Sequence, residues 1–239
     1  MEVKELIAGA GRARVGRLSL LAGWQKERGR DDRWNDPDPW DEDRTSSSGR
    51  LNLPVTYSGI ILIICVLVFL ISNAFPTFTN NYLELKPAFL AAHPWTIITH
   101  MFVHADMAHL FFNMLFLFFF GMELERRVGE SKFLQIFIIS GIVAAIGQMA
   151  VLPAESLVGA SGALFGVMGC LAVIAPEISV LLFFFIPLSI RAAIVLLAVI
   201  DFAFMGSETN IAHMAHITGL LVGLAYGGLL KDRYRYRYR

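Results

Sequence analysis

The chain has 239 residues, of which 56% are hydrophobic and 17% are charged. A soluble domain has about a quarter charged residues, and here half of the 20 basic and 20 acidic side chains lie in the first 50 positions. This composition excludes an ordinary water-soluble enzyme, a disordered protein and a nucleic-acid binder. It predicts an all-α protein that crosses a membrane several times, with a polar N-terminal extension.

The polar extension covers residues 1–50. Positions 3–25 combine apolar and basic side chains in the pattern of an amphipathic helix on a membrane surface. Positions 26–50 have the composition of a flexible charged linker, and disorder of the whole extension is the alternative. We therefore divide the chain into a cytoplasmic extension (1–50), a six-span core (51–232) and a basic cytoplasmic tail (233–239).

Six hydrophobic segments follow the extension, and each is a candidate for a membrane-spanning helix. A bilayer core of about 30 Å requires about 20 residues of helix for each crossing. Pro187 is expected to begin the fifth segment, because proline is tolerated in the first turn of a helix. The apolar stretch 178–186 is then a loop or a helix extension at the interface. The segments lie near residues 57–75, 107–122, 133–152, 159–176, 188–205 and 211–230.

The basic residues predict how the spans are oriented. With the N-terminus in the cytoplasm, six spans return the C-terminus to the same side, and only Lys86 among the basic residues then lies outside. This distribution agrees with the preference of Lys and Arg for cytoplasmic segments. Residues 1–50 are too rich in Asp and Glu for an organelle transit peptide, so we expect a multi-pass protein of the cell membrane of a prokaryote.

Polar residues within the predicted spans carry the functional information, because each must be satisfied internally or serve a function. With this orientation, His109, Ser161 and His216 all lie near the outer ends of their helices. Three spans therefore deliver a serine and histidines to one depth. The polar residues of interest are His109, Asn113, Ser161, Asp201, His213 and His216.

Glycines at intervals of four residues indicate which of these helices pack together. They occur in the fourth and sixth segments, and small residues at this spacing let two membrane helices approach closely. Packing one ridge on the other would bring the Ser161 hydroxyl toward the His216 ring. A serine needs such a neighbouring base to become an effective nucleophile. The glycines are Gly162 and Gly166 in one segment and Gly219, Gly223 and Gly227 in the other.

Several short motifs, in this order and in a six-span frame, resemble the rhomboid family of intramembrane serine proteases over residues 57–230. They are Trp95 to His104, His109-Leu-Phe-Phe-Asn113, Glu125-Arg-Arg-Val-Gly129, Gly159-Ala-Ser161-Gly162 and Ala215-His216-Ile-Thr-Gly219. The family often has Trp-Arg in the first loop, whereas Trp95 is followed here by Thr96, so the family's contacts in this loop are not carried over to this chain, while the implied chemistry is unaffected.

The resemblance implies an activity and a set of roles. Ser161 would attack the peptide bond and His216 would serve as its base, in a dyad without a third acid. The Ser161 backbone N–H and the side chains of Asn113 and His109 would hold the oxyanion. Substrates would be other membrane proteins, cut near the outer end of a span, with no cofactor and no metal. Residues with an implied supporting role are Gly159, Gly162, Gly166, Gly219, Gly223, Glu125 and Arg127.

Alternatives remain for individual residues. A lone serine in a membrane helix usually bonds to its own backbone, and His213 is a second possible base. Asp201 is expected as a hydrogen-bond partner between helices, with contact to the active site as the less favoured alternative. His100 and His104 could bind a metal with His109, but no cysteine or carboxylate lies in register.

Alternatives also remain for the function as a whole. A zinc protease would need His-Glu-x-x-His, which is absent, and an aspartyl protease would need two intramembrane aspartates. A small transporter would place its polar groups near the midplane of the membrane. A catalytically inactive rhomboid-like protein that binds membrane proteins would be expected to have lost Ser161 or His216.

Overall fold

The computed structural model describes residues 56–182, 185–203 and 212–234. The chain divides into two units, residues 1–53 and 54–239, and all described residues belong to the second. The predicted extension (1–50) and all but the first two residues of the predicted tail lie outside the described residues.

The described residues are mostly helical, and a helix overlaps each of the six predicted segments. The elements are α2 (Tyr57–Ala74), α3 (Pro76–Tyr82), η4 (Pro87–Phe89), α4 (Thr96–Thr99), η5 (His100–Phe102), α5 (Met107–Phe116), the π-helical η6 (Leu117–Gly121), α6 (Met122–Val128), α7 (Glu130–Val151), α8 (Ser161–Ile174), β1 (Ser179–Leu182), β2 (Ile186–Ser189), α9 (Ile190–Ala203) and α10 (His213–Tyr234).

Four of these helices are long and apolar enough to cross a membrane: α2, the continuous helix α5–η6–α6, α7 and α10. The second is longer than predicted because it continues through η6 and α6 to Val128. The helices α8 and α9 are apolar but have only 14 residues each, or about 21 Å of helix. The chain is therefore a helical multi-pass membrane protein.

The prediction that Pro187 begins the fifth helix is wrong. Residues 179–189 form an antiparallel hairpin in which Pro187 of β2 lies opposite Leu181 of β1, and a two-stranded hairpin tolerates proline because each strand has an unpaired edge. The helix α9 begins only at Ile190. Its start is marked by Ser189, whose Oγ accepts a hydrogen bond from the N–H of Ala192 at 3.2 Å, as an N-cap does.

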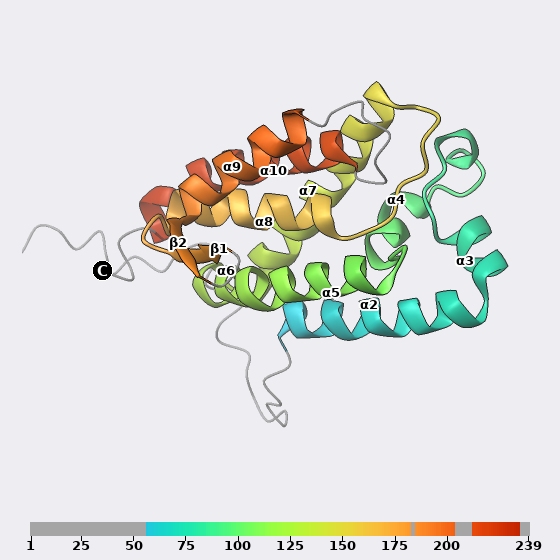
Figure 1. The fold of residues 1–239 in the computed structure, drawn as a ribbon, viewed down its shortest axis with the longest axis horizontal. Helices are drawn as coiled ribbons and strands as arrows, with labels where there is room; N and C mark the ends of the chain where they lie inside the picture. The colour runs from blue at the N-terminus through green and yellow to red at the C-terminus, as the bar shows by residue number, and fades with distance from the viewer. Residues whose placement is uncertain (1–55, 183–184, 204–211, 235–239) are drawn as a thin grey trace, which may run out of the picture. The chain divides into compact units, whose positions relative to one another are not determined.

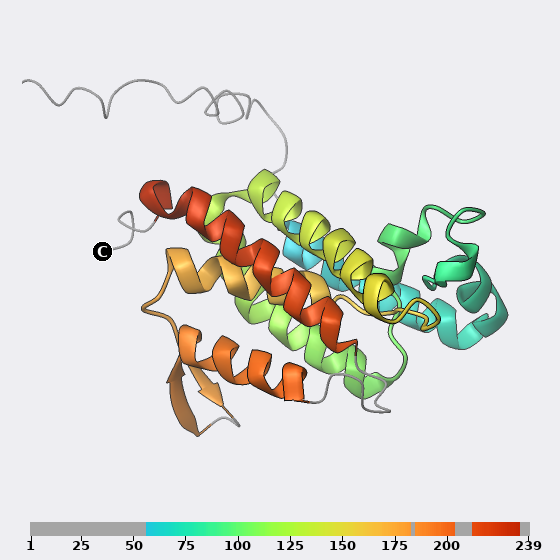
Figure 2. The ribbon, with the colours of Figure 1, turned by 90° about the horizontal axis from the view of Figure 1, so that it is seen from above.

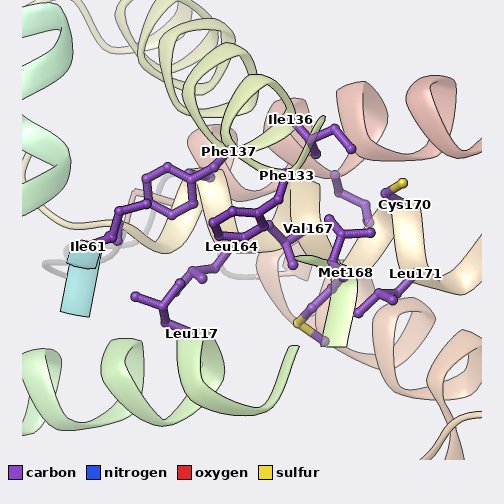
Figure 3. Packing of buried hydrophobic residues seen from close by; sticks show 14 of the residues in the cluster. Ile61, Leu117, Phe133, Ile136, Phe137, Leu164, Val167, Met168, Cys170 and Leu171 are labelled. Carbon is purple, nitrogen blue, oxygen red and sulfur yellow. The ribbon is translucent and has the colours of Figure 1, made fainter. Parts of the chain in front are cut away.

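The helix α8 occupies the centre of the described bundle, between α10 and α7 on one side and α5 on the other (Figures 1 and 2). Most of its side chains are buried. Figure 3 shows Phe133 and Phe137 of α7 beside Leu164 and Val167 of α8, with Leu117 of η6 completing the layer. The core of the bundle is therefore built around the helix that begins with Ser161.

The glycines of α8 and α10 bring the two backbones into direct contact. A Cβ atom added at Gly219 would lie 2.0 Å from the carbonyl oxygen of Gly162, and one at Gly223 would lie 1.8 Å from that of Gly166. Real Cβ atoms cannot approach an oxygen this closely, so only glycine fits at these two positions of α10. We call this contact the α8–α10 seam.

At the opposite end of the bundle from Ser161, charged side chains join α6 to its neighbours. The carboxylate of Glu125 accepts hydrogen bonds from the N–H groups of Tyr57 and Ser58 and from the Ser58 hydroxyl, which caps the start of α2. Arg127 is buried and pairs with Glu123 at 2.6 Å and with Glu177 at 2.9 Å. Glu125 thus connects α6 to α2, and Arg127 connects α6 to Glu177 in the segment that follows α8.

Candidate active site

Three helices begin at the same end of the bundle and carry the predicted site residues on their first turns. Ser161 is the first residue of α8, His216 lies in the first turn of α10, and His109 lies in the first turn of α5. Asn113 follows one turn after His109. Helix N-termini carry partial positive charge, so this end of the bundle favours a negative group.

The turn that leads into α8 is fixed by contacts with the preceding loop and with α5. Gly159 has a φ of 110°, a conformation that side chains rarely permit, and its N–H donates to the carbonyl oxygen of His100 at 2.9 Å. A Cβ atom at Gly159 would lie 2.7 Å from the His109 ring. Ala160 provides no side-chain cap, so among the described residues no side chain caps the first amide N–H groups of α8.

Ser161 and His216 are in hydrogen-bond contact. The His216 Nε2 atom lies 2.8 Å from the Ser161 Oγ atom. The imidazole stacks on Phe165, one turn further along α8, with ring centroids 4.3 Å apart and an angle of 6° between the ring planes. The ring of His216 is therefore held flat against Phe165 with its Nε2 directed at the serine.

The other ring nitrogen of His216 contacts an aspartate. The Nδ1 atom lies 3.0 Å from Asp201 Oδ1, and His213 Nδ1 lies 2.6 Å from the same oxygen. The described contacts of His213 thus include this carboxylate, while the contact with Ser161 is made by His216. Asp201 thus joins α9 to α10, as the favoured prediction from the sequence had it, and through His216 it also contacts the candidate site, as the less favoured alternative had it.

His109 and Asn113 lie beside the Ser161 turn but do not hydrogen-bond to Ser161 in the described part of the chain. The Asn113 Nδ2 atom donates to the carbonyl oxygen of His109 at 2.8 Å. Asn113 is buried, and its Oδ1 atom has no protein partner among the described residues. The amide group carries a second N–H, which no hydrogen bond among the described residues uses.

The sequence comparisons identify the family. The family model for the rhomboid domain matches residues 91–233, which include every residue of this site. The chain belongs to the rhomboid family.

Three relatives show the range of rhomboid proteins that this chain resembles. It is 33% identical to YdcA of Bacillus subtilis, named as a candidate rhomboid protease, over 60% of this chain and 71% of the relative. It is 35% identical to the rhomboid protease GluP of the same organism, over 54% of this chain and 24% of GluP. It is 33% identical to the mitochondrial RHOMBOID-like protein 6 of Arabidopsis thaliana, over 62% of this chain and 47% of the relative. The chain thus spans less than half the length of the last two.

A small cavity adjoins the serine of this rhomboid chain. Its volume is about 10 Å³, and its lining includes Ser161, Gly159 and Ala215 together with His100 of the first loop. A cavity of this size has room for about one water molecule, and a water needs polar partners to stay there. Ser161 therefore lies against both the His216 ring and a space of water size.

Two histidines of the first loop are buried close to the site and are held neutral. Burial lowers the pKa of His100 to about 4, and burial together with the nearby His109 lowers the pKa of His104 to about 4. The rings of His104 and His109 are 5.2 Å apart. Across the described ranges, no three His, Cys, Asp or Glu side chains are arranged to hold a metal ion.

Sequence reasoning missed two residues that shape this site. Phe165 was not singled out, although it is one turn from Ser161 on the same helix face. Gln148 of α7 accepts a hydrogen bond from the N–H of Ala215 at 3.2 Å and so caps the start of α10. A polar residue near the outer end of a predicted span was the signal that could have revealed Gln148.

Proposed function

We propose that this rhomboid protein is an intramembrane serine endopeptidase in which Ser161 is the nucleophile and His216 is the general base. The observation that carries the proposal is the 2.8 Å contact between Ser161 Oγ and His216 Nε2. His216 takes the proton of the serine hydroxyl as Ser161 attacks the peptide carbonyl, and later returns it to the departing amine. The relatives that are named as rhomboid proteases support this reading.

The groups around Ser161 suit the charge that develops on the carbonyl oxygen. The first amide N–H groups of α8 carry no side-chain cap from the described part of the chain, so in the proposal they donate to the oxyanion. The second N–H of the Asn113 amide and the ring of His109 are the further donors in the proposal. Such donors are worth roughly 3–4 kcal/mol each in serine hydrolases.

The architecture supports a membrane-protein substrate. The reacting groups lie near the ends of apolar helices, so a peptide bond must reach them at the edge of the bilayer. We place α8 and α9 as the two remaining spans of a six-span core, with both termini in the cytoplasm and the Ser161 end outside. The substrate is then a transmembrane segment of another protein, which is cleaved near its outer end.

The experiment uses the full chain in detergent and in liposomes with a serine-directed fluorophosphonate probe and a model transmembrane substrate. We expect covalent labelling and cleavage in the wild type, loss of both in Ser161→Ala, and in His216→Ala a loss of cleavage with labelling reduced to a slow residual rate. Ser72→Ala and His93→Ala are matched controls and should retain both activities, since neither residue lies at the site. Thermal unfolding of every variant shows whether the fold is intact.

The result also separates the protease from an inactive rhomboid-like binder. Labelling that persists in Ser161→Ala would show that another residue is the nucleophile. A well-folded wild-type chain that neither labels nor cleaves, yet captures the model substrate, would replace the proposal with a binding function.

A further inference from the structure

Asp201 is a buried carboxylate that no role in a two-residue mechanism accounts for. Its side chain lies on α9 and is only 7% exposed. A carboxylate inside a membrane bundle is costly unless donors satisfy it. Its described donors are His213 and His216, and both use their Nδ1 atoms on the same oxygen, Oδ1.

This contact determines where the proton of the His216 ring resides. An ionised carboxylate can only accept hydrogen bonds, so His216 Nδ1 must carry hydrogen. In the neutral ring Nε2 then has a lone pair, and this is the atom that faces the Ser161 hydroxyl. The carboxylate therefore selects the one tautomer in which His216 can act as a base.

The same contact stabilises the ring after proton transfer. The serine proton moves from Oγ to Nε2, the Nδ1 proton remains on the ring, and Asp201 stays ionised beside the resulting imidazolium. His213 donates to the same oxygen and so restrains the carboxylate from rotating away. The other side chains around the ring are Phe165 on α8 and His109 on α5.

We propose that Asp201 is a positioning residue that holds His216 in its basic tautomer and stabilises its protonated form, with His213 anchoring the carboxylate. The inference rests on the proposed protease function, because it assigns a partner to the base of that reaction. The alternative is a purely structural tie between α9 and α10.

The test compares Asp201→Asn with the wild type in cleavage and in fluorophosphonate labelling. We expect kcat to fall by roughly 10²–10⁴-fold, as loss of the equivalent charge does in serine proteases, while KM stays within about twofold. Asp232→Asn is the matched control, since Asp232 is an exposed acid at the other end of α10, and it should leave kcat unchanged.

A double substitution distinguishes positioning from a structural tie. Residues that act as a unit are not additive, so Asp201→Asn should cause no further loss when His216 is already alanine. A structural tie would reduce the residual labelling rate by the same factor with and without His216. That additive result, or a kcat within about threefold of wild type in Asp201→Asn, overturns the inference.

A measurement on the unaltered chain keeps the inference falsifiable if Asp201→Asn fails to fold. Nitrogen-15 NMR of histidine-labelled protein, with His216→Ala to assign the signal, reports which ring nitrogen is protonated. We expect a protonated Nδ1 and an unprotonated Nε2 in neutral His216, and the opposite tautomer overturns the inference. Absence of Ser161-dependent labelling in the wild type would instead remove the protease proposal, and this inference with it.

Discussion

The α8–α10 seam and the helix α9 hold the proposed reacting groups in different ways. At the seam, the backbones of Gly162 and Gly219 are in direct contact, so the two helices cannot shift without a clash or a gap. The helix α9 is tied mainly by side chains, through Asp201 and through the bond from Arg191 Nε to the Ala172 carbonyl oxygen at 3.0 Å. Much of its surface is exposed, including Val199 at 59%.

The rigid backbone contact and the side-chain contact suit the different geometric precision that their proposed roles require. The proposed proton transfer between Ser161 and His216 needs a separation set to a fraction of an ångström, and glycine-mediated backbone contact supplies that rigidity. An aspartate that orients a ring from its far side tolerates a small displacement, because a charged hydrogen bond adapts in length. The proposed reacting pair thus lies on the rigid contact, and the acid proposed to support it lies on the adaptable one.

Breaking the seam should have the largest effect. In Gly223→Ala, the new Cβ would lie 1.8 Å from the Gly166 carbonyl oxygen, so α8 and α10 must separate. We expect the free energy of unfolding to fall by more than about 3 kcal/mol and cleavage to be lost. Gly228→Ala, next to no other group within 4 Å, is the control. Measured by unfolding in detergent, equal stability of the two variants would contradict the packing argument.

Acid should weaken the loop that supports the Ser161 turn. The pKa values of His100 and His104 are about 4 in the folded chain, against about 6.5 for an unfolded histidine. As the pH falls from 6.5 to 4, the unfolded chain binds protons that the folded chain does not. The free energy of unfolding therefore decreases. The loss is roughly 3 kcal/mol for each histidine.

Denaturant unfolding at several pH values measures this effect. In His100→Gln and in His104→Gln, the dependence of stability on pH between 4 and 6.5 should be about half that of the wild type. A wild-type stability that is constant over this range would show that the two rings are protonated in the folded chain.

Substitutions on α9 test the packing of this helix, which is held less rigidly than the α8–α10 seam. Ile194 is 5% exposed and packs against the core, whereas Val199 faces outward on the same helix. Ile194→Ser should lower the free energy of unfolding by about 2 kcal/mol or more, while Val199→Ser should change it by less than about 0.5 kcal/mol. Equal losses in thermal unfolding would mean that the outward face of α9 is packed as tightly as its inward face.

Much of the fold was predictable because hydropathy and glycine spacing act locally. Apolar runs of helical length fixed the places of the helices, and the glycines at intervals of four predicted which two would pack. The same register favoured His216 over His213 as the neighbour of Ser161. The prediction at Pro187 was wrong because proline is compatible with both a helix start and a strand. Only Ser189, as an N-cap residue, could indicate that α9 begins at Ile190.

The contact of Asp201 could not be derived from the sequence. Whether its carboxylate faces His216, lipid or another helix depends on the rotation of α9 about its axis. Apolar residues occur all around this helix, so the sequence does not indicate which of its faces is buried. The structure of the first loop could not be predicted from the sequence either, because the burial of His100 and His104 depends on how that loop folds over the turn at Gly159.

The π-helical segment η6 has a consequence for both ends of its helix. The N–H of Met122 donates to the carbonyl oxygen of Leu117, so this turn holds one more residue than an α-helical turn, and every later residue lies about 100° back around the axis from where regular winding would put it. His109 and Asn113 can thus lie toward the Ser161 end of the bundle while Glu125, twelve positions beyond Asn113, faces the start of α2. If the same residues wound as a regular α-helix throughout, the Glu125 carboxylate would turn by about 100° away from its cap, so this wider turn is what lets a single helix serve two unrelated partners.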